Sequence, residues 1–249
     1  MIYVYAIADR PEEPLPSQLG LHDEALSAVI WRDIGAVVSK FNGVQMSKTA
    51  DELWRHEEVV ESLMSVRAVL PARFGTLLPS RQHVDDILRR VYRALVQDIE
   101  RVRGHVEIGM RFLSTFETGA ELNQPLTTSD GLMPPGAGPG SAYLRARLAQ
   151  KRQLQDRQRA KLGLVRDVYA LLASHANASW LDGELDDRHG ISAAFLVPRD
   201  RIGSFRDVVG EVAYANPGLA LLCTGPWPPY SFVRAGAGAT GWSEECHAT

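Results

Sequence analysis

Cysteine is scarce in this chain, and neither a long apolar run nor a secretory signal is present. The two cysteines, Cys223 and Cys246, are too few for a disulfide framework and favour a reducing compartment such as the cytoplasm. No apolar stretch approaches the roughly 18 to 20 residues that span a bilayer. Residues 1–9 lack the basic segment that begins a signal peptide. We therefore expect a cytoplasmic protein with no membrane insertion.

Catalytic and cofactor-binding signatures are missing as well. His56 and Glu57 begin like a zinc-protease motif, but Val60 stands where the second histidine is required. The glycines at 136–140 fit neither a phosphate loop, which needs GKS or GKT, nor a dinucleotide fingerprint after a strand. We therefore expect no cofactor, no metal site and no enzymatic activity.

Two reactive side chains have simpler structural interpretations. His56 lies on the apolar stripe of an expected helix, where a hydrogen-bonded core histidine is a simpler interpretation than a catalytic group. Arg73 and Phe74 follow a proline-marked strand. Arg73 either offers its cation to a partner's carboxylate or forms a structural salt bridge near the strand end.

Charge is unevenly distributed along the chain. The formal net charge is −3, but residues 145–166 contain eight basic residues and the single acid Asp156, a local net of +7. The remaining chain therefore carries −3 minus 7, or −10. Such a helix either has a solvated or internally paired face, or binds a partner through Arg152, Arg157 and Arg159. That partner would be nucleic acid, an anionic membrane surface or an acidic protein. Aromatic residues suited to base stacking are not interleaved with these cations, which disfavours nucleic acid.

The residues that are present predict a mixed α+β protein, since 45% are hydrophobic and 23% are charged. In residues 1–113, strand and helix patterns follow one another as β-β-β-α-β-α-β. The extended runs are 2–8, 26–31, 34–39, 68–76 and 105–113, and the helices begin after Thr49 and Ser80. Runs 26–31 and 34–39 are joined by Arg32 and Asp33, the length expected of a tight hairpin. Thr49 and Glu52 have capping-box spacing. We expect a ferredoxin-like lobe with its helices on one face of a mostly antiparallel sheet.

A second lobe is expected after a change in composition. Residues 114–140 are rich in proline, glycine, serine and threonine and are predicted to be a flexible linker or insertion. Residues 141–234 then predict a second α+β domain, a modified ferredoxin-like unit with a long basic helix. Its elements are a helix over 141–178, strands over 191–197 and 218–224, and a helix between them. Residues 235–249 are expected to form a flexible tail.

The last strand runs into a proline-rich motif, Gly225–Phe232. Its three prolines remove backbone donors, so the segment is predicted to stop the strand and not to continue as a central strand. Trp227 and Tyr230 are presented on this stiff backbone. They either close the core of the second lobe or dock a partner.

These motifs together resemble the gas vesicle protein F/L family. The resemblance rests on the amino-terminal strand, the His56-Glu57 helix, Leu70–Gly75, Val106–Arg111 and Thr224–Val233, in this order. It implies two ferredoxin-like lobes and a non-enzymatic accessory or minor structural protein of gas vesicles. Its implied partners are the hydrophobic shell protein and other accessory proteins, and its implied location is the cytoplasm in association with gas vesicles. Candidate partner-binding residues are Arg73, Phe74, Trp227, Tyr230, Arg152, Arg157 and Arg159.

Overall fold

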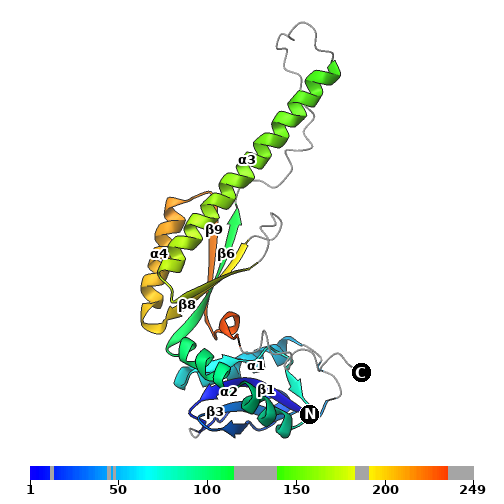
Figure 1. The fold of residues 1–249 in the computed structure, drawn as a ribbon, viewed down its shortest axis with the longest axis vertical. Coiled ribbons are helices and arrows are strands. Elements are labelled where there is room, and N and C mark those ends of the chain that lie inside the picture. Colours follow the sequence, from blue (N-terminus) through cyan, green and yellow to red (C-terminus); the bar gives the residue numbers. More distant parts are fainter. Residues whose placement is uncertain (12–13, 44–45, 47–48, 115–138, 183–190, 235–249) are drawn as a thin grey trace.

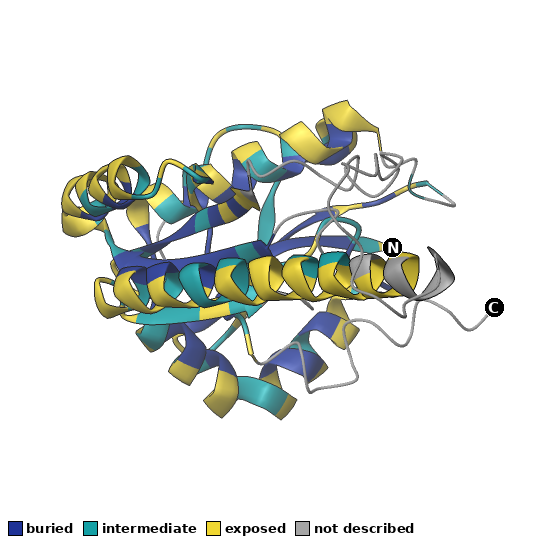
Figure 2. Ribbon diagram, turned by 90° about the horizontal axis from the view of Figure 1, so that it is seen from above, coloured by how far each residue is buried: buried dark blue, intermediate teal, exposed yellow. Residues whose placement is uncertain are grey.

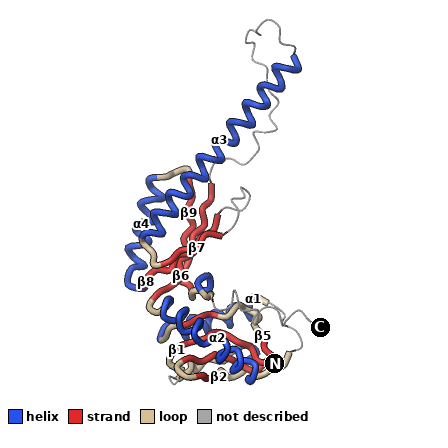
Figure 3. The backbone as a smooth tube through the Cα atoms, viewed as in Figure 1, coloured by secondary structure: helices blue, strands red, loops and turns tan. Residues whose placement is uncertain are grey.

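The chain folds into two antiparallel sheets with helices packed against them, a mixed α+β fold (Figure 1, Figure 3). The computed structural model describes all residues except 12–13, 44–45, 47–48, 115–138, 183–190 and 235–249. Most of the expected linker over 114–140 and the whole expected tail over 235–249 lie outside the described residues.

The first sheet is built around the amino-terminal strand. Its strands are β1 (Ile2–Asp9), β2 (Ser27–Trp31), β3 (Ile34–Lys40), β4 (Val69–Pro71) and β5 (Leu77–Leu78). Their order is β2-β3-β1-β4, and β5 also pairs with β1. The expected hairpin is confirmed: β2 and β3 are joined by two residues, and Arg32 takes the positive φ of 56° that a turn without glycine requires here.

Two helices belong with this sheet, and both begin at the predicted caps. In α1 (Ala50–Val66), the Thr49 hydroxyl accepts from the Glu52 backbone N–H at 3.3 Å and the Glu52 carboxylate accepts from the Thr49 N–H at 3.1 Å. This is the predicted capping box. In α2 (Arg81–Val102), Ser80 is the cap. The capping residues therefore set where each helix starts.

The two helices cover opposite faces of the first sheet. Side chains of β1 lie in two cores, one on each face of the sheet, and a register shift between Val4 and Ala6 interrupts their alternation. Val4 and Ile7 pack with α2, whereas Tyr3, Tyr5 and Ala8 pack with α1. The expectation that the helices share one face is therefore wrong.

The second sheet has the order β7-β8-β6-β9. Its strands are β6 (His105–Ser114), β7 (Ala178–Asp182), β8 (Ile191–Pro198) and β9 (Leu219–Trp227). We expected residues 105–113 in the first lobe, but β6 pairs with β8 and β9 and is the centre of the second sheet. The alternation of residues within β6 predicts which of its side chains share a face. It does not identify the strands that pair with β6, which lie more than 70 residues later in the chain.

Helices α3 (Pro139–Ser174) and α4 (Ile202–Ala215) cover one face of the second sheet. The carboxy-terminal half of α3 is buried there through Val165, Val168 and Leu172. Its amino-terminal half extends beyond the sheet, and most of its described side chains are exposed (Figure 1, Figure 2). No helix among the described residues is long and apolar enough to cross a membrane.

Strand β9 continues further than predicted. It includes Gly225 and Pro226 and ends at Trp227, which pairs with Glu107. The proline is accommodated because β9 is an edge strand whose register shifts between Glu107 and Gly109. The predicted stop therefore comes three residues late, although the segment is not a central strand.

The two sheets share part of one core. The cluster beneath α2 also contains Ala194 and Leu196 of β8 and Phe232, which follows β9. Helix α2 leads into β6 through Arg103 and Gly104 alone. A short connection and common apolar contacts thus hold the second sheet against the first.

Candidate functional site

The segment Pro228–Arg234, which we call the clasp, crosses from the end of β9 to the first sheet. It contains a short 3-10 turn over Tyr230–Phe232, and Pro228, Pro229 and Phe232 are buried. Residues from α1, α2 and β6 bind it. The clasp is therefore the point at which distant parts of the chain meet.

Tyr230 connects the clasp to α1. Its hydroxyl donates to Glu57 Oε1 at 2.8 Å and lies 3.2 Å from His56 Nε2. Burial and the neighbouring Glu57 carboxylate raise the pKa of the Tyr230 phenol, so it stays protonated and acts as the donor. Burial also raises the pKa of Glu57.

His56 is a buried hydrogen-bonded core residue, as the simpler interpretation predicts. Its Nδ1 lies 2.9 Å from the Tyr3 hydroxyl, and its Nε2 lies 3.2 Å from the Ala72 carbonyl oxygen. Tyr5 stacks on the imidazole and Phe74 meets it edge-on, each with ring centroids 5.8 Å apart. Burial lowers the pKa of His56 to about 4, so the ring is neutral near pH 7.

Glu107 of β6 binds the next residue of the clasp. Its two carboxylate oxygens accept from the backbone N–H and the hydroxyl of Ser231, both at 2.8 Å. Burial raises the pKa of Glu107, and the two Ser231 hydrogen bonds partly offset that effect. A carboxylate held by two donors fixes the direction of the chain after β9.

Helix α2 binds the end of the clasp. Asp98 accepts from the Arg234 backbone N–H at 2.7 Å and pairs with Arg101 at 2.8 Å. Arg101 in turn donates to the Phe232 carbonyl oxygen. The contacts at Glu57, His56, Glu107 and Asp98 provide partners for the Tyr230 and Ser231 hydroxyls and for the backbone N–H groups of Ser231 and Arg234, which lie beyond the end of β9.

Four of the candidate partner-binding residues, Arg73, Phe74, Trp227 and Tyr230, differ in exposure. Phe74 and Tyr230 are half-buried, whereas Arg73 and Trp227 are exposed. Tyr230 and Phe74 come together around His56 of α1, so Tyr230 packs against the first sheet's helix and not, as one interpretation expected, over the core of the second lobe. Arg73 is exposed, and its carbonyl oxygen accepts from the hydroxyl of Thr76 at 2.6 Å. Trp227 remains 40% exposed at the end of β9.

Trp227 borders a sheet face that α3 and α4 do not cover. Cross-strand pairing places Leu222 opposite Arg111 and Trp180 opposite Ala194, on the face away from these helices. Trp180 is 48% and Leu222 50% exposed. We call Leu113, Trp180, Leu222 and Trp227 the open face. Each of these large apolar side chains is at least 37% exposed, and polar residues such as Arg111 lie among them.

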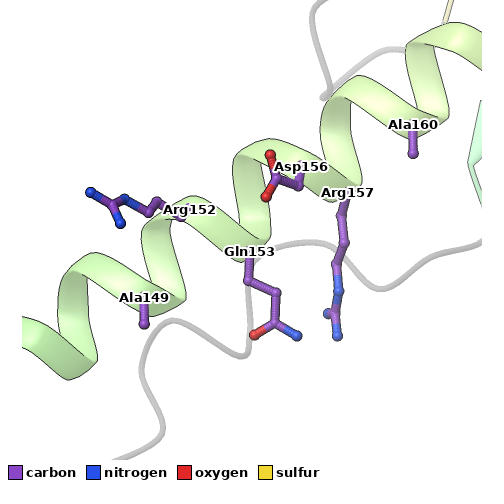
Figure 4. Close-up of a pocket in the computed structure, with 6 residues that line it drawn as sticks. All are labelled: Ala149, Arg152, Gln153, Asp156, Arg157 and Ala160. Atoms are coloured by element: carbon purple, nitrogen blue, oxygen red, sulfur yellow. The ribbon is translucent and has the colours of Figure 1, made fainter.

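The other candidate partner-binding residues lie far from the clasp, on the extended half of α3 (Figure 1). Arg152, Arg157 and Arg159 are all exposed there. Figure 4 shows a shallow hollow along this helix, with Gln153 and Arg157 extending from the same side. Its described lining residues all belong to α3, and it brings no residues of other elements together.

Sequence reasoning missed most of the clasp contacts. The sequence pattern places Glu107 in a strand and Asp98 in a helix, and nothing local signals that they bind Ser231 and Arg234. A buried position for a charged residue is the available hint, since buried carboxylates need donors. Among the described residues, no group of three or more His, Cys, Asp or Glu side chains is placed to hold a metal ion.

Comparisons with known proteins agree with the motifs. The family model described as gas vesicle synthesis protein GvpL/GvpF matches residues 1–234. Gas vesicle protein L of a Streptomyces species is 31% identical over 192 residues, covering 74% of this chain and 69% of the relative. Gas vesicle protein F2 of Halobacterium salinarum is 25% identical over 242 residues, covering 96% of this chain and 94% of the relative.

Solved structures agree on the fold. The gas vesicle protein GvpF of an Anabaena species superimposes with a TM-score of 0.70 at 20% identity, covering 94% of this chain and 95% of that one. GvpF of Microcystis aeruginosa gives a TM-score of 0.67 at 18% identity, covering 94% and 98%. With a family match over nearly the whole chain, motifs in the family's order and a shared fold, this protein belongs to the gas vesicle GvpL/GvpF family.

Proposed function

We propose that this protein is an accessory or minor structural protein of gas vesicles that binds the hydrophobic shell protein and aids nucleation or assembly of the vesicle wall. The family match over residues 1–234 carries the proposal. It acts through surfaces and without catalysis, in the cytoplasm and at growing vesicles, where other accessory proteins are further partners.

The open face is the surface that best fits a hydrophobic partner. Trp180, Leu222 and Trp227 present apolar area that the helices leave uncovered. Aromatic side chains at the centre of an interface contribute much of its binding energy. Among the candidate residues, Trp227 therefore keeps the docking role, whereas Tyr230 and Phe74 support the fold beneath it.

The test is a pull-down with the purified shell protein. We expect the double variant Leu222→Ser and Trp227→Ala to lose binding while keeping the wild-type circular dichroism spectrum. Tyr214→Ser is the matched control, because this aromatic is 91% exposed but lies on α4, away from the open face.

Two results together contradict the proposal: no binding of the wild-type protein to the shell protein, and normal vesicles in a deletion strain. Binding that is lost equally in the double variant and in the Tyr214 control would contradict only the choice of the open face.

The nucleic-acid alternative has less support. The described cations of α3 are exposed apart from Lys161, which is half-buried, and Leu144, Leu148 and Gln155 lie among them. Binding of a single strand needs several aromatic side chains on which bases stack. The described residues between 143 and 161 offer one, Tyr143, and the Arg147 guanidinium already lies 5.7 Å from its ring centroid. Protein is the better match for a surface that combines arginine and leucine.

A further inference from the structure

Four arginines of α3 form a stripe with strict spacing. Arg145, Arg152, Arg159 and Arg166 follow one another at intervals of seven residues, and all are exposed. Seven residues are nearly two helical turns, so these side chains share one face and are about 10.5 Å apart along the axis. We call them the arginine stripe. It lies opposite the buried stripe of Val165 and Val168. Asp156 shares this face and pairs with Arg159 at 3.8 Å, but both side chains are exposed, and such surface pairs are weak.

Helix α1 presents a surface of opposite charge around an exposed tryptophan. Trp54 is 72% exposed, and the neighbouring Leu53 is 45% exposed. Four carboxylates share the helix face of Trp54. One lies three residues before it, and the others lie three, four and seven residues after it. They are Asp51, Glu58 and Glu61, which are exposed, and Glu57, which is half-buried and binds Tyr230. The single cation, Arg55, pairs with Glu58 at 3.1 Å.

The two surfaces match in spacing as well as in charge. Asp51 and Glu58 are seven residues apart, as are Arg152 and Arg159. Two helices lying side by side therefore bring both pairs together at once, with Trp54 between them. A guanidinium pairs well with a carboxylate and also stacks on the face of an indole ring.

Within one molecule, the arginine stripe and the carboxylates of α1 do not meet. The half of α3 that bears Arg145, Arg152 and Arg159 extends beyond the second sheet, away from the lobe that holds α1 (Figure 1). The chain outside residues 145–166 has a net charge of −10 against +7 within them, so two copies attract each other through unlike regions.

We propose that α1 of one copy docks on the arginine stripe of a second copy, with Trp54 and its carboxylates facing Arg152 and Arg159. In a dimer with two-fold symmetry this contact forms twice, because α1 of each copy then meets the arginine stripe of the other. The contact is independent of shell-protein binding, which uses the open face.

The experiment is a charge swap on the full chain, followed by analytical ultracentrifugation at about 50 mM and about 500 mM salt, where screening is weak and strong respectively. One variant carries Glu58→Arg and Glu61→Arg, and the other carries Arg152→Glu and Arg159→Glu. We expect the wild type to self-associate at low salt and each variant to be monomeric. An equimolar mixture of the two should associate again, since both reversed surfaces then meet unlike charge.

Two further variants control for non-specific effects. Trp54→Ala should weaken association at least tenfold without unfolding the protein, because the side chain is mostly exposed. Asp207→Arg with Glu211→Arg makes the same charge change on exposed positions of α4 and should leave association unchanged.

A wild type that stays monomeric at low salt overturns the proposal, and so does a mixture that fails to associate. Self-association that persists in the Arg152/Arg159 variant, with loss of binding to a DNA duplex or to anionic vesicles, also overturns it and assigns the stripe to that ligand.

Discussion

His56 shows at the scale of a residue how a polar group is accommodated in this core. Both ring nitrogens have partners from other elements, and two aromatic rings enclose the imidazole. A neutral ring meets these contacts without the cost of burying a charge. The residue that most resembled a catalytic group therefore has a structural role.

The lowered pKa of His56 predicts acid sensitivity. The pKa is about 4 in the folded protein against 6.5 in the unfolded chain, so the unfolded chain binds more protons between these values. The stabilising contribution is complete above pH 6.5 and is lost as the pH falls through 4, at most about 3 kcal/mol.

Urea unfolding at pH 7, 6, 5 and 4 checks this prediction. His56→Gln should unfold with a weaker dependence on pH over this range. The raised pKa values of Glu57 and Glu107 act in the opposite direction, because protonation favours the folded state there. An identical pH dependence in wild type and variant would contradict the role of His56.

At the scale of an element, β9 and α4 place very different demands on glycine. Gly225 of β9 has a φ of +106°, and a Cβ built there would lie 2.8 Å from the Glu107 carbonyl oxygen. Gly210 lies inside α4, where an added Cβ meets nothing within 4 Å. One glycine is required by the turn into the clasp and the other is not.

Alanine at these two positions should therefore act with opposite sign. Gly225→Ala is expected to lower the free energy of unfolding by more than about 1 kcal/mol, through strain and a backbone clash. Gly210→Ala should raise it by about 0.5 to 1 kcal/mol, because alanine is the better helix former. Denaturant melts measure both, and a neutral Gly225→Ala would show that the turn tolerates a side chain.

At the scale of the whole molecule, the shared core and the clasp join the two sheets. Phe232 and Leu196 lie in the same cluster as the α2 core, and Tyr230 binds α1. Local unfolding of either sheet would break these contacts. The sequence predicts domains over 1–113 and 141–234. Because β6 belongs to the second sheet, we propose that the boundary lies before β6, near Gly104.

We expect both sheets to unfold in one cooperative transition. Variants that keep only Trp31, in the first sheet, or only Trp180, in the second, report the two sheets separately by fluorescence. Their urea midpoints should coincide. Midpoints that differ by more than the error of the fits would show that the clasp does not couple the sheets.

The sequence by itself determined the local elements and the family. The caps at Thr49 and Ser80, the hairpin at Arg32 and the period of β6 are set by residues close together in the chain, and each is confirmed. The family motifs are likewise read directly from consecutive residues.

Only the tertiary structure decided which elements meet. The membership of β6 in the second sheet, the cover on both faces of the first and the contact between His56 and Tyr230, which are 174 residues apart, were not predicted. Periodicity shows that a strand has a buried face but does not identify what buries it. That choice depends on packing between distant segments, which a local pattern does not contain.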